Sequence, residues 1–247
     1  MSAAGLIVLP LPVRPLGGET VSSYLHRLAM RNGVSPDRLA RMVGAHPDTT
    51  EAIAALSGLD PRTLPSALPQ LRPGFPDDAD RASRRCPACT WCALAARAGP
   101  ATVLAAPDRV VCRRHRRWIG GPVLACRADQ QFDCASIPAM MAAGSRHHGL
   151  AAQWGLPGYG AAFAESIHTL GRAQARGLLV GHGDQAINDR RRLLASAAPN
   201  LSGTALDILA WYPATVAHTA AILRRRHSPK ATPTPTRDGL EYLTHVT

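Results

Sequence analysis

The stretch ETVSSYLHRLAMRNGVSPDRLARMVG, residues 19–44, predicts two short helices joined by a tight turn. Its first half carries apolar residues at the spacing that brings side chains to one face of a helix. These residues are Val21, Tyr24, Leu25, Leu28 and Ala29. Asn32 and Gly33 are typical of helix ends, so we expect the first helix to end just before them.

A second helix is expected directly after this turn. Ser35 is a suitable N-cap, Pro36 fits the first helical position, and Gly44 ends the pattern. Arg38 and Arg41 are expected on the exposed side of this helix, where they are candidate DNA contacts. Helix, turn and helix have the form of a helix-turn-helix, but an ordinary helical hairpin that packs a core has the same pattern.

The rest of the chain predicts a mainly α protein built from several parts. A proline-rich linker ends an N-terminal helical domain over residues 1–75. Residues 81–135 are expected to form a small zinc-ribbon-like module, followed by a C-terminal helical region over residues 136–227. Residues 228–247 are predicted to be a flexible tail.

Further helices are expected within these domains. Two short ones are predicted near residues 49–57 and 61–68, and two more near 160–176 and 184–197. A last pair is expected to meet at the Trp-Tyr-Pro sequence of residues 211–213, where the proline begins the second helix of the pair.

Two short cysteine and histidine pairs mark a candidate metal site. Cys86-Pro-Ala-Cys89 and Cys112-Arg-Arg-His115 each place two metal-binding side chains one tight turn apart, with 22 residues between the pairs. Three thiolates and one imidazole suit a tetrahedral structural zinc ion, and four protein ligands leave no open position for catalysis. The alternative is that buried cysteines form such pairs by chance.

Three cysteines remain outside these pairs, and they leave a second zinc ion open as a hypothesis. They are Cys92, Cys126 and Cys134. Cys92 extends a C-x-x-C-x-x-C run, so it is also able to replace Cys89 as a ligand of the first ion. His147 and His148 are interpreted as part of an exposed loop, with a role as a further ligand as the alternative.

The chain is basic, with 28 Lys and Arg against 17 Asp and Glu and a net charge of +11. Residues 81–128 hold ten arginines and one acid, Asp108, and hence a charge of +9. A basic surface of this density fits the phosphate backbone of nucleic acid, whereas a solvated basic face and codon bias toward arginine are the alternatives. The candidate contacts in this module are Arg84, Arg85, Arg113, Arg114, Arg116 and Arg117. Trp91 and Trp118 are expected to pack its small core, with stacking on nucleic-acid bases as the alternative.

Several functions are excluded by missing residues. Lys230 is the only lysine, and it lies between Pro229 and Ala231, so the chain has no Walker A loop and no kinase lysine. The His-Glu-x-x-His pattern of zinc proteases is also missing. We expect no membrane-spanning segment and no signal peptide, and hence a cytoplasmic, nucleoid-associated protein.

Four segments together resemble proteins of the TniQ family. The segment PVRPLGGETVSSYLHRLAMRNGVSPDRLARMVG is similar to the opening of these proteins, and AALSGLDPRTL to the segment that follows. The pairs CPAC and CRRH resemble the family's zinc pairs, and LAWYPATVAHTAAIL resembles its helix-Trp-x-Pro-helix feature. The chain departs from the family where a second cysteine pair often follows, since only Cys126 and a displaced Cys134 remain.

The resemblance implies a non-catalytic accessory protein of DNA transposition. Such proteins help to choose the target site on double-stranded DNA, and they work with an AAA+ ATPase and a transposase complex. Relatives in CRISPR-associated transposons connect a guide-RNA complex to the ATPase. The alternative function is a stand-alone, zinc-containing helix-turn-helix transcriptional regulator, which typically binds a palindrome as a dimer. A hydrolytic metalloenzyme is the least favoured hypothesis, because no general base follows the metal pairs closely.

Overall fold

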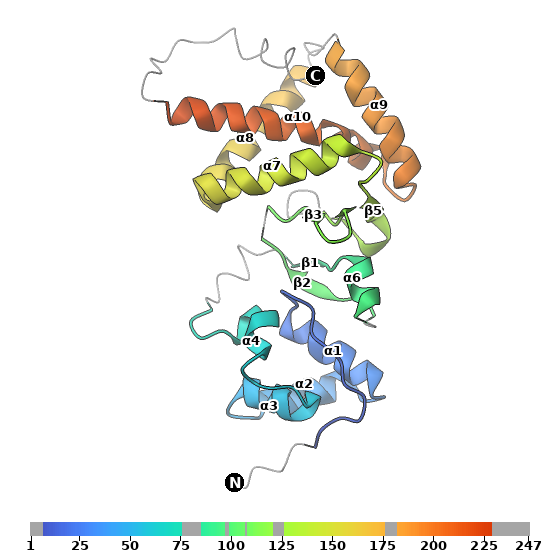
Figure 1. Cartoon of the computed structure of the whole chain (residues 1–247), viewed down its shortest axis with the longest axis vertical. Helices are drawn as coiled ribbons and strands as arrows, with labels where there is room; N and C mark the ends of the chain where they lie inside the picture. Colours follow the sequence, from blue (N-terminus) through green and yellow to red (C-terminus); the bar gives the residue numbers. More distant parts are fainter. Residues whose placement is uncertain are drawn as a thin grey trace. The chain divides into compact units, whose positions relative to one another are not determined.

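A computed structural model of the chain describes residues 7–75, 85–96, 99–106, 108–120, 126–175 and 182–228. The backbone is mainly helical with two small antiparallel sheets, which confirms the mainly α prediction (Figure 1). The described residues belong to two compact units. The first lies within Met1–Pro107 and Ile119–Gln131, and the second within Asp108–Trp118 and Phe132–Thr247.

The first unit begins with a group of short helices. They are α1 (Val21–Arg31), α2 (Pro36–Gly44), α3 (Thr49–Ser57), α4 (Leu64–Ala67) and the 3-10 helix η1 (Pro69–Leu71). The turn between α1 and α2 lies where the sequence predicted it, because both of its signals are local. The Thr20 side chain caps α1 by accepting a hydrogen bond from the Ser23 amide, and Gly33 adopts a φ of 65° in the turn.

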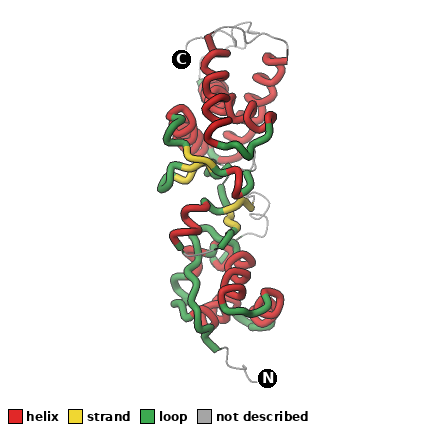
Figure 2. The backbone as a smooth tube through the Cα atoms, turned by 90° about the vertical axis from the view of Figure 1, so that its right-hand side faces the viewer, coloured by secondary structure: helices red, strands yellow, loops and turns green. Residues whose placement is uncertain are grey.

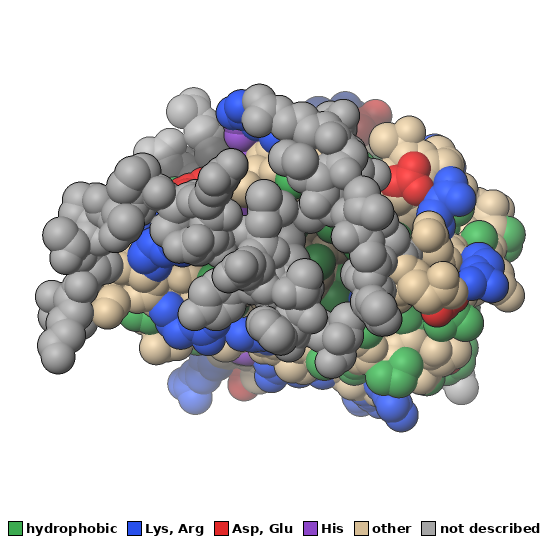
Figure 3. Space-filling model, turned by 90° about the horizontal axis from the view of Figure 1, so that it is seen from above, with side chains coloured by type: hydrophobic (Ala, Val, Ile, Leu, Met, Phe, Trp, Pro, Cys, Tyr) green, Lys and Arg blue, Asp and Glu red, His purple; other side chains and the backbone are tan. Residues whose placement is uncertain are grey.

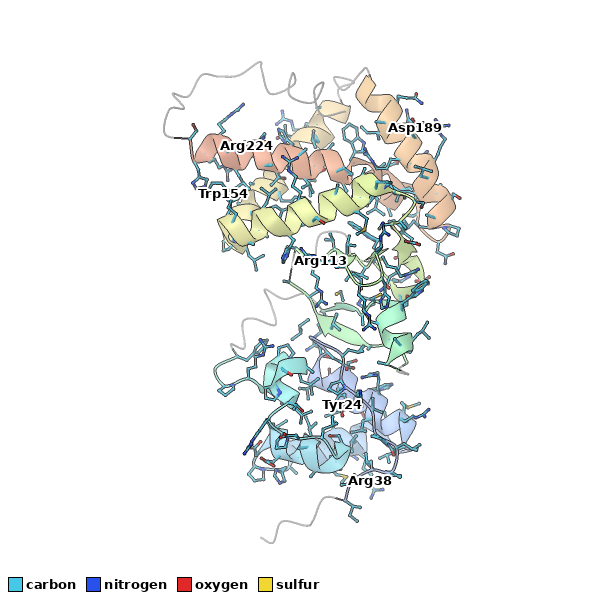
Figure 4. The ribbon with its side chains drawn as sticks, viewed as in Figure 1. Tyr24, Arg38, Arg113, Trp154, Asp189 and Arg224 are labelled. Carbon is cyan, nitrogen blue, oxygen red and sulfur yellow. The ribbon has the colours of Figure 1, made fainter. Side chains whose placement is uncertain are left out.

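The apolar faces of these helices share one core. Tyr24 and Leu28 of α1, Leu39 of α2 and Ile53 of α3 are at most 1% exposed. The Tyr24 hydroxyl donates to the carbonyl of Val13 at 2.9 Å, so the extended segment before α1 is held against this core (Figure 4).

The first unit also holds a two-stranded sheet. The sheet consists of β1 (Arg85–Pro87) and β2 (Thr102–Leu104), and it is accompanied by the helix α6 (Thr90–Ala95) and the 3-10 helix η2 (Ala128–Gln130). β1 and β2 pair antiparallel, with Cys86 opposite Val103. The Gln131 side chain fixes the start of α6, because it donates to the Ala88 carbonyl and accepts from the Thr90 amide, both at 2.9 Å.

The second unit combines a three-stranded sheet with long helices (Figure 2). The elements are β3 (Val111–Cys112), β4 (Arg117–Trp118), β5 (Phe132–Asp133), α7 (Pro138–Trp154), α8 (Leu156–Ala175), α9 (His182–Ala197) and α10 (Gly203–Arg226). α10 contacts α7, α8 and α9, and it runs alongside α7 in Figure 1. Trp118 is 1% exposed and packs against Phe132 and Tyr212, which confirms its predicted core role.

One prediction about this unit's helices is wrong. The pair of helices expected to meet at Pro213 is one helix, α10, with the proline inside it. Carbonyls beside the proline accept from side chains, since Arg190 donates to the Ala210 carbonyl and Thr215 to the Trp211 carbonyl. Because proline has no amide hydrogen, the helix lacks the hydrogen bond to the Leu209 carbonyl, and the burial of Leu209, Tyr212 and Val216 in the second unit offsets this loss.

Two predictions about single residues are also wrong. His147 lies on α7 and is 2% exposed, so it is not part of a loop. α7 itself was missed, because its alanine- and glycine-rich sequence carries little helical periodicity. Trp91 is 51% exposed, because the short helix α6 buries Ala93 and turns Trp91 away from that side.

Among the described residues, α10 is the one helix long and apolar enough to cross a membrane by length and composition. Its apolar side chains pack within the second unit, where Leu209, Tyr212, Val216 and Leu223 are at most 3% exposed. A buried core helix of a folded domain has the same composition as a spanning one, so we interpret α10 as a core helix.

Candidate metal centre and basic surface

Three cysteines and one histidine form a candidate metal centre. The thiols of Cys89, Cys92 and Cys112 and one ring nitrogen of His115 all lie within 4.8 Å of one another. Cys89 and Cys112 are buried, whereas Cys92 and His115 are half-buried. A tetrahedral ion at thiolate and imidazole bond lengths holds its ligand atoms about 3.3–3.8 Å apart, so a small adjustment of this group is enough to hold one metal ion.

Each ligand is positioned by a short local element. Cys89 is the residue before the first turn of α6, and Cys92 follows three positions later on that helix. Cys112 ends β3, and His115 lies in the turn that leads into β4. Cys112 Sγ and His115 Nδ1 are 3.7 Å apart, so both atoms are able to bind the same metal ion, as the Cys-x-x-His spacing predicted.

The structural group and the set predicted from spacing share three residues. The sequence assigned Cys86 as a ligand and gave Cys92 as a possible substitute for Cys89, whereas the structure keeps Cys89 and brings Cys92 to the group in place of Cys86. Cys86 lies in β1, is 9% exposed and stands opposite Val103. The signal for Cys92 was present in the sequence as the third cysteine of the C-x-x-C-x-x-C run.

Of the three cysteines predicted for a second metal ion, Cys92 belongs to this group, whereas Cys126 and Cys134 lie outside it. Cys126 is 5% exposed, and its thiol donates to the carbonyl of Arg127 at 3.3 Å. Cys134 is fully buried beyond β5, and this burial raises the pKa of its thiol to about 12. The second metal ion stays a prediction.

The candidate arginines divide by exposure. Those with exposed side chains are Arg38, Arg41, Arg85, Arg113, Arg114 and Arg116, and Arg84 lies outside the described residues. Arg38 and Arg41 lie on α2, whose buried residues are Leu39 and Val43, and both arginine side chains are exposed. Arg38 is labelled in Figure 4. Arg117 is half-buried in β4, directly opposite Asp133.

Arg85 also lines a polar pocket at the start of α1. The other lining residues are Thr20, Ser22, Ser23, His26, Pro100 and Thr102. The described residues that line this pocket offer hydroxyl groups, a histidine and an arginine, and none of them is acidic, so its chemistry suits an anion.

Elsewhere on the second unit, several arginines are paired with acids. Arg191 pairs with Asp207, Arg192 with Asp189, and Arg226 with Glu165. In Figure 3 the blue arginine side chains of the visible face are spread over separate places, some of them beside red acidic groups. These pairs lower the positive charge available there for a partner.

The fold and these residues define a class of protein: mainly helical and basic, with a cysteine and histidine group able to hold a metal ion. The TniQ family model matches residues 10–128, so this part of the chain is similar to the TniQ family. Proteins of this family are generally non-catalytic accessory proteins, and the match implies a transposition-associated adaptor role. No curated protein and no solved structure matches the chain.

Proposed function

We propose that the chain is a DNA-binding adaptor of DNA transposition that helps to select the target site and recruits an AAA+ ATPase and the transposase. The match of residues 10–128 to the TniQ family carries this proposal. The net charge of +11 and the exposed arginines support a nucleic-acid partner. The chain performs no reaction of its own in this role, and it acts at the DNA of the nucleoid.

In this proposal α1 and α2 act as a helix-turn-helix that contacts double-stranded DNA. α2 is the second helix of the pair, buries Leu39 and Val43, and exposes Arg38 and Arg41. The second helix of such a motif enters the major groove, where guanidinium groups bind phosphates and guanine edges.

The DNA-binding part is tested with the Arg38→Ala/Arg41→Ala double variant. We expect its affinity for a labelled duplex to fall about tenfold or more, because two guanidinium contacts are lost. Arg62→Ala is the matched control, since Arg62 is exposed in the same unit but lies outside α2. Fluorescence anisotropy at several salt concentrations measures both. Equal affinities of the double variant and the wild type would contradict the role of α2.

The recruitment part is tested by tagging the protein in its host, treating the lysate with nuclease, and identifying co-purifying proteins by mass spectrometry. Recovery of an AAA+ ATPase or a transposase supports the adaptor. Recovery of components of a guide-RNA complex would assign the chain to the CRISPR-associated type. Recovery of the protein alone, with DNA binding intact, would overturn the adaptor and favour the transcriptional regulator.

We further propose that the candidate metal centre holds one structural zinc ion through Cys89, Cys92, Cys112 and His115, which places it in a zinc-ribbon-like module. Three thiols and one imidazole are a donor set that zinc prefers, and four protein ligands close the site. When bound, zinc would act here as a cross-link between the α6 pair and the Cys112–His115 pair, because small zinc modules seldom stay folded without metal.

The fourth ligand is tested with two matched cysteine variants. Elemental analysis of protein purified without chelator is expected to find about one zinc per chain. Cys92→Ser is expected to lose most of this zinc, whereas Cys86→Ser is expected to keep it. The reverse result would return Cys86 to the ligand set, and a wild type without zinc would overturn the metal proposal.

A further inference from the structure

The turn between β3 and β4 has an unusual residue at its last position. Val111 pairs with Trp118 and Cys112 with Arg117, so residues 113–116 form a four-residue loop. Arg116, the last of the four, has a φ of 53°. Among the described residues it is the one non-glycine residue with a positive φ, and the six others are Gly18, Gly33, Gly58, Gly74, Gly120 and Gly155.

This conformation is unfavourable for arginine. In the left-handed region the Cβ atom crowds the following carbonyl, and glycine avoids this because it has no Cβ. The surrounding structure holds Arg116 there, since its carbonyl accepts a hydrogen bond from the Cys134 amide at 2.9 Å. Glycine would fit this position with less strain, and it is the residue that the chain uses at its other positive-φ positions. An arginine kept at such a position is therefore a candidate for function.

The side chains of this turn are available to a partner. Arg113, Arg114 and Arg116 are exposed, and within the described part of the chain none of their guanidinium groups forms a hydrogen bond or an ion pair. Arg113 is labelled in Figure 4, on the loop that follows β3. The neighbouring Arg117 differs, because it is half-buried and stands opposite Asp133.

We infer that the loop of residues 113–116 binds the phosphate backbone of double-stranded DNA, and that Arg116 is retained in its strained conformation because its guanidinium makes one of these contacts. Three unpaired guanidinium groups on one short turn are complementary to neighbouring phosphates. Contacts of this kind position a protein on DNA without reading its sequence, so this loop complements the base contacts proposed for α2. The inference rests on the proposed DNA-binding function and assigns a second surface to it.

The variant Arg116→Gly distinguishes a strained residue from a DNA contact, because it is expected to raise the stability of the protein and to lower its affinity for DNA. Removal of the left-handed penalty is expected to raise the melting temperature by about 2–4 °C. Loss of one phosphate contact is expected to weaken duplex affinity about fivefold to tenfold and to lower the slope of log affinity against log salt by about 0.9. A residue with only a structural role would not move the salt slope.

Two further variants complete the experiment. Arg116→Lys keeps both the charge and the Cβ, so it is expected to keep the wild-type salt slope and not to gain stability. Arg224→Ala removes one exposed charge from the last turn of α10, outside the loop, and controls for net charge. Thermal melting and anisotropy with a random-sequence duplex are measured on the full chain.

The possible results separate the two proposals. Wild-type protein that binds the duplex while Arg116→Gly keeps the same affinity and salt slope would overturn the inference and leave the DNA-binding function standing. Wild-type protein that does not bind the duplex would overturn the DNA-binding function and the inference with it. Tighter binding to single-stranded RNA than to the duplex, lost in Arg116→Gly, would overturn the choice of DNA as the partner.

Discussion

The helices α1–α4 and the helices α7–α10 each bury a basic side chain, but they do so in different ways. In the first group Arg27 is a charged residue whose guanidinium is paired with the buried Glu19. In the second group His147 is buried among aromatic rings, and its hydrogen-bond partner among the described residues is the Tyr212 hydroxyl, not an acid. The two regions therefore respond to different perturbations, one to loss of a partner and the other to pH.

The Arg27–Glu19 pair is fully enclosed. Arg27 donates through Nε and one terminal nitrogen to the two carboxylate oxygens, both at 2.8 Å, and also donates to the Arg14 carbonyl at 3.0 Å. Glu19 further accepts from the Leu16 amide and the Ser23 hydroxyl, each at 2.9 Å. A two-point pair with these additional bonds compensates for the removal of both charges from water.

His147 is kept neutral instead of paired. Its Nδ1 atom shares a hydrogen bond of 2.8 Å with the Tyr212 hydroxyl, and its ring lies 4.6 Å from that of Tyr159. Burial lowers the pKa of His147 to about 4, although the nearby Asp108 opposes part of this shift and His148 adds to it. A neutral imidazole is easier to bury than an ion, but the stability of this region then depends on pH.

The largest expected effect comes from breaking the ion pair. Arg27→Met leaves the Glu19 carboxylate, which is 0% exposed, without its cation. We expect a loss of about 3–5 kcal/mol in the free energy of unfolding of the first unit, measured by urea denaturation. The Glu19→Gln/Arg27→Met double variant should lose less, because no charge remains buried. A double variant that loses as much as the single one would contradict this account.

A smaller effect is expected from acid. The pKa of His147 in the folded state, about 4, lies below the ordinary value of 6.5, so the unfolded chain binds the proton more readily. The contribution of neutral His147 to the free energy of unfolding is roughly 3 kcal/mol at most. It is fully present above pH 6.5 and is lost as the pH falls toward 4. Denaturation of the second unit across this range measures the slope.

The control for the acid effect is His147→Asn. Asparagine can replace the hydrogen bond of Nδ1 to Tyr212 but does not titrate, so its unfolding free energy should depend less on pH between 4 and 6.5. Carboxylates elsewhere titrate in both proteins, so their contributions cancel in the difference between the two unfolding free energies. Identical pH profiles for the two proteins would show that His147 does not set the acid response.

The smallest effect concerns packing within the second unit. A Cβ at Gly144 of α7 would lie 2.8 Å from Val111 Cγ2, so Gly144→Ala is expected to destabilise the unit by about 1 kcal/mol despite the better helix propensity of alanine. Gly149→Ala on the same helix meets nothing within 4 Å and is expected to stabilise it by about 0.5–1 kcal/mol. Thermal melting shows whether each variant is stabilised or destabilised. Stabilisation by Gly144→Ala would show that Val111 of β3 moves to make room for the added methyl group at little cost.

The N-terminal helices were the most predictable part of the fold. α1 ends at Arg31 before Asn32 and Gly33, α2 begins at Pro36, and α3 spans Thr49–Ser57, all as the sequence indicated. The C-terminal helices were less predictable. α8 and α9 lie close to the expected ranges, whereas α7 was missed and α10 continues through Pro213.

The candidate site shows the same division. The C-x-x-C and C-x-x-H spacings identified Cys89, Cys112 and His115 without any structure, because each pair is a local geometric unit. The choice between Cys86 and Cys92 depended on whether β1 or α6 carries the fourth thiol toward the others. Spacing alone could not decide this, since both cysteines lie three residues from Cys89.

The sequence by itself determined the mainly helical class, the bounds of the first helices, the basic charge and three residues of the metal group. These features depend on neighbours a few residues apart, such as caps, periodicity and pair spacing. Tertiary structure decided the burial of His147, the continuity of α10, the place of Cys92 and the strained φ of Arg116. Each of these depends on what long-range packing and hydrogen bonds impose on a segment, and local preference is too weak to oppose them.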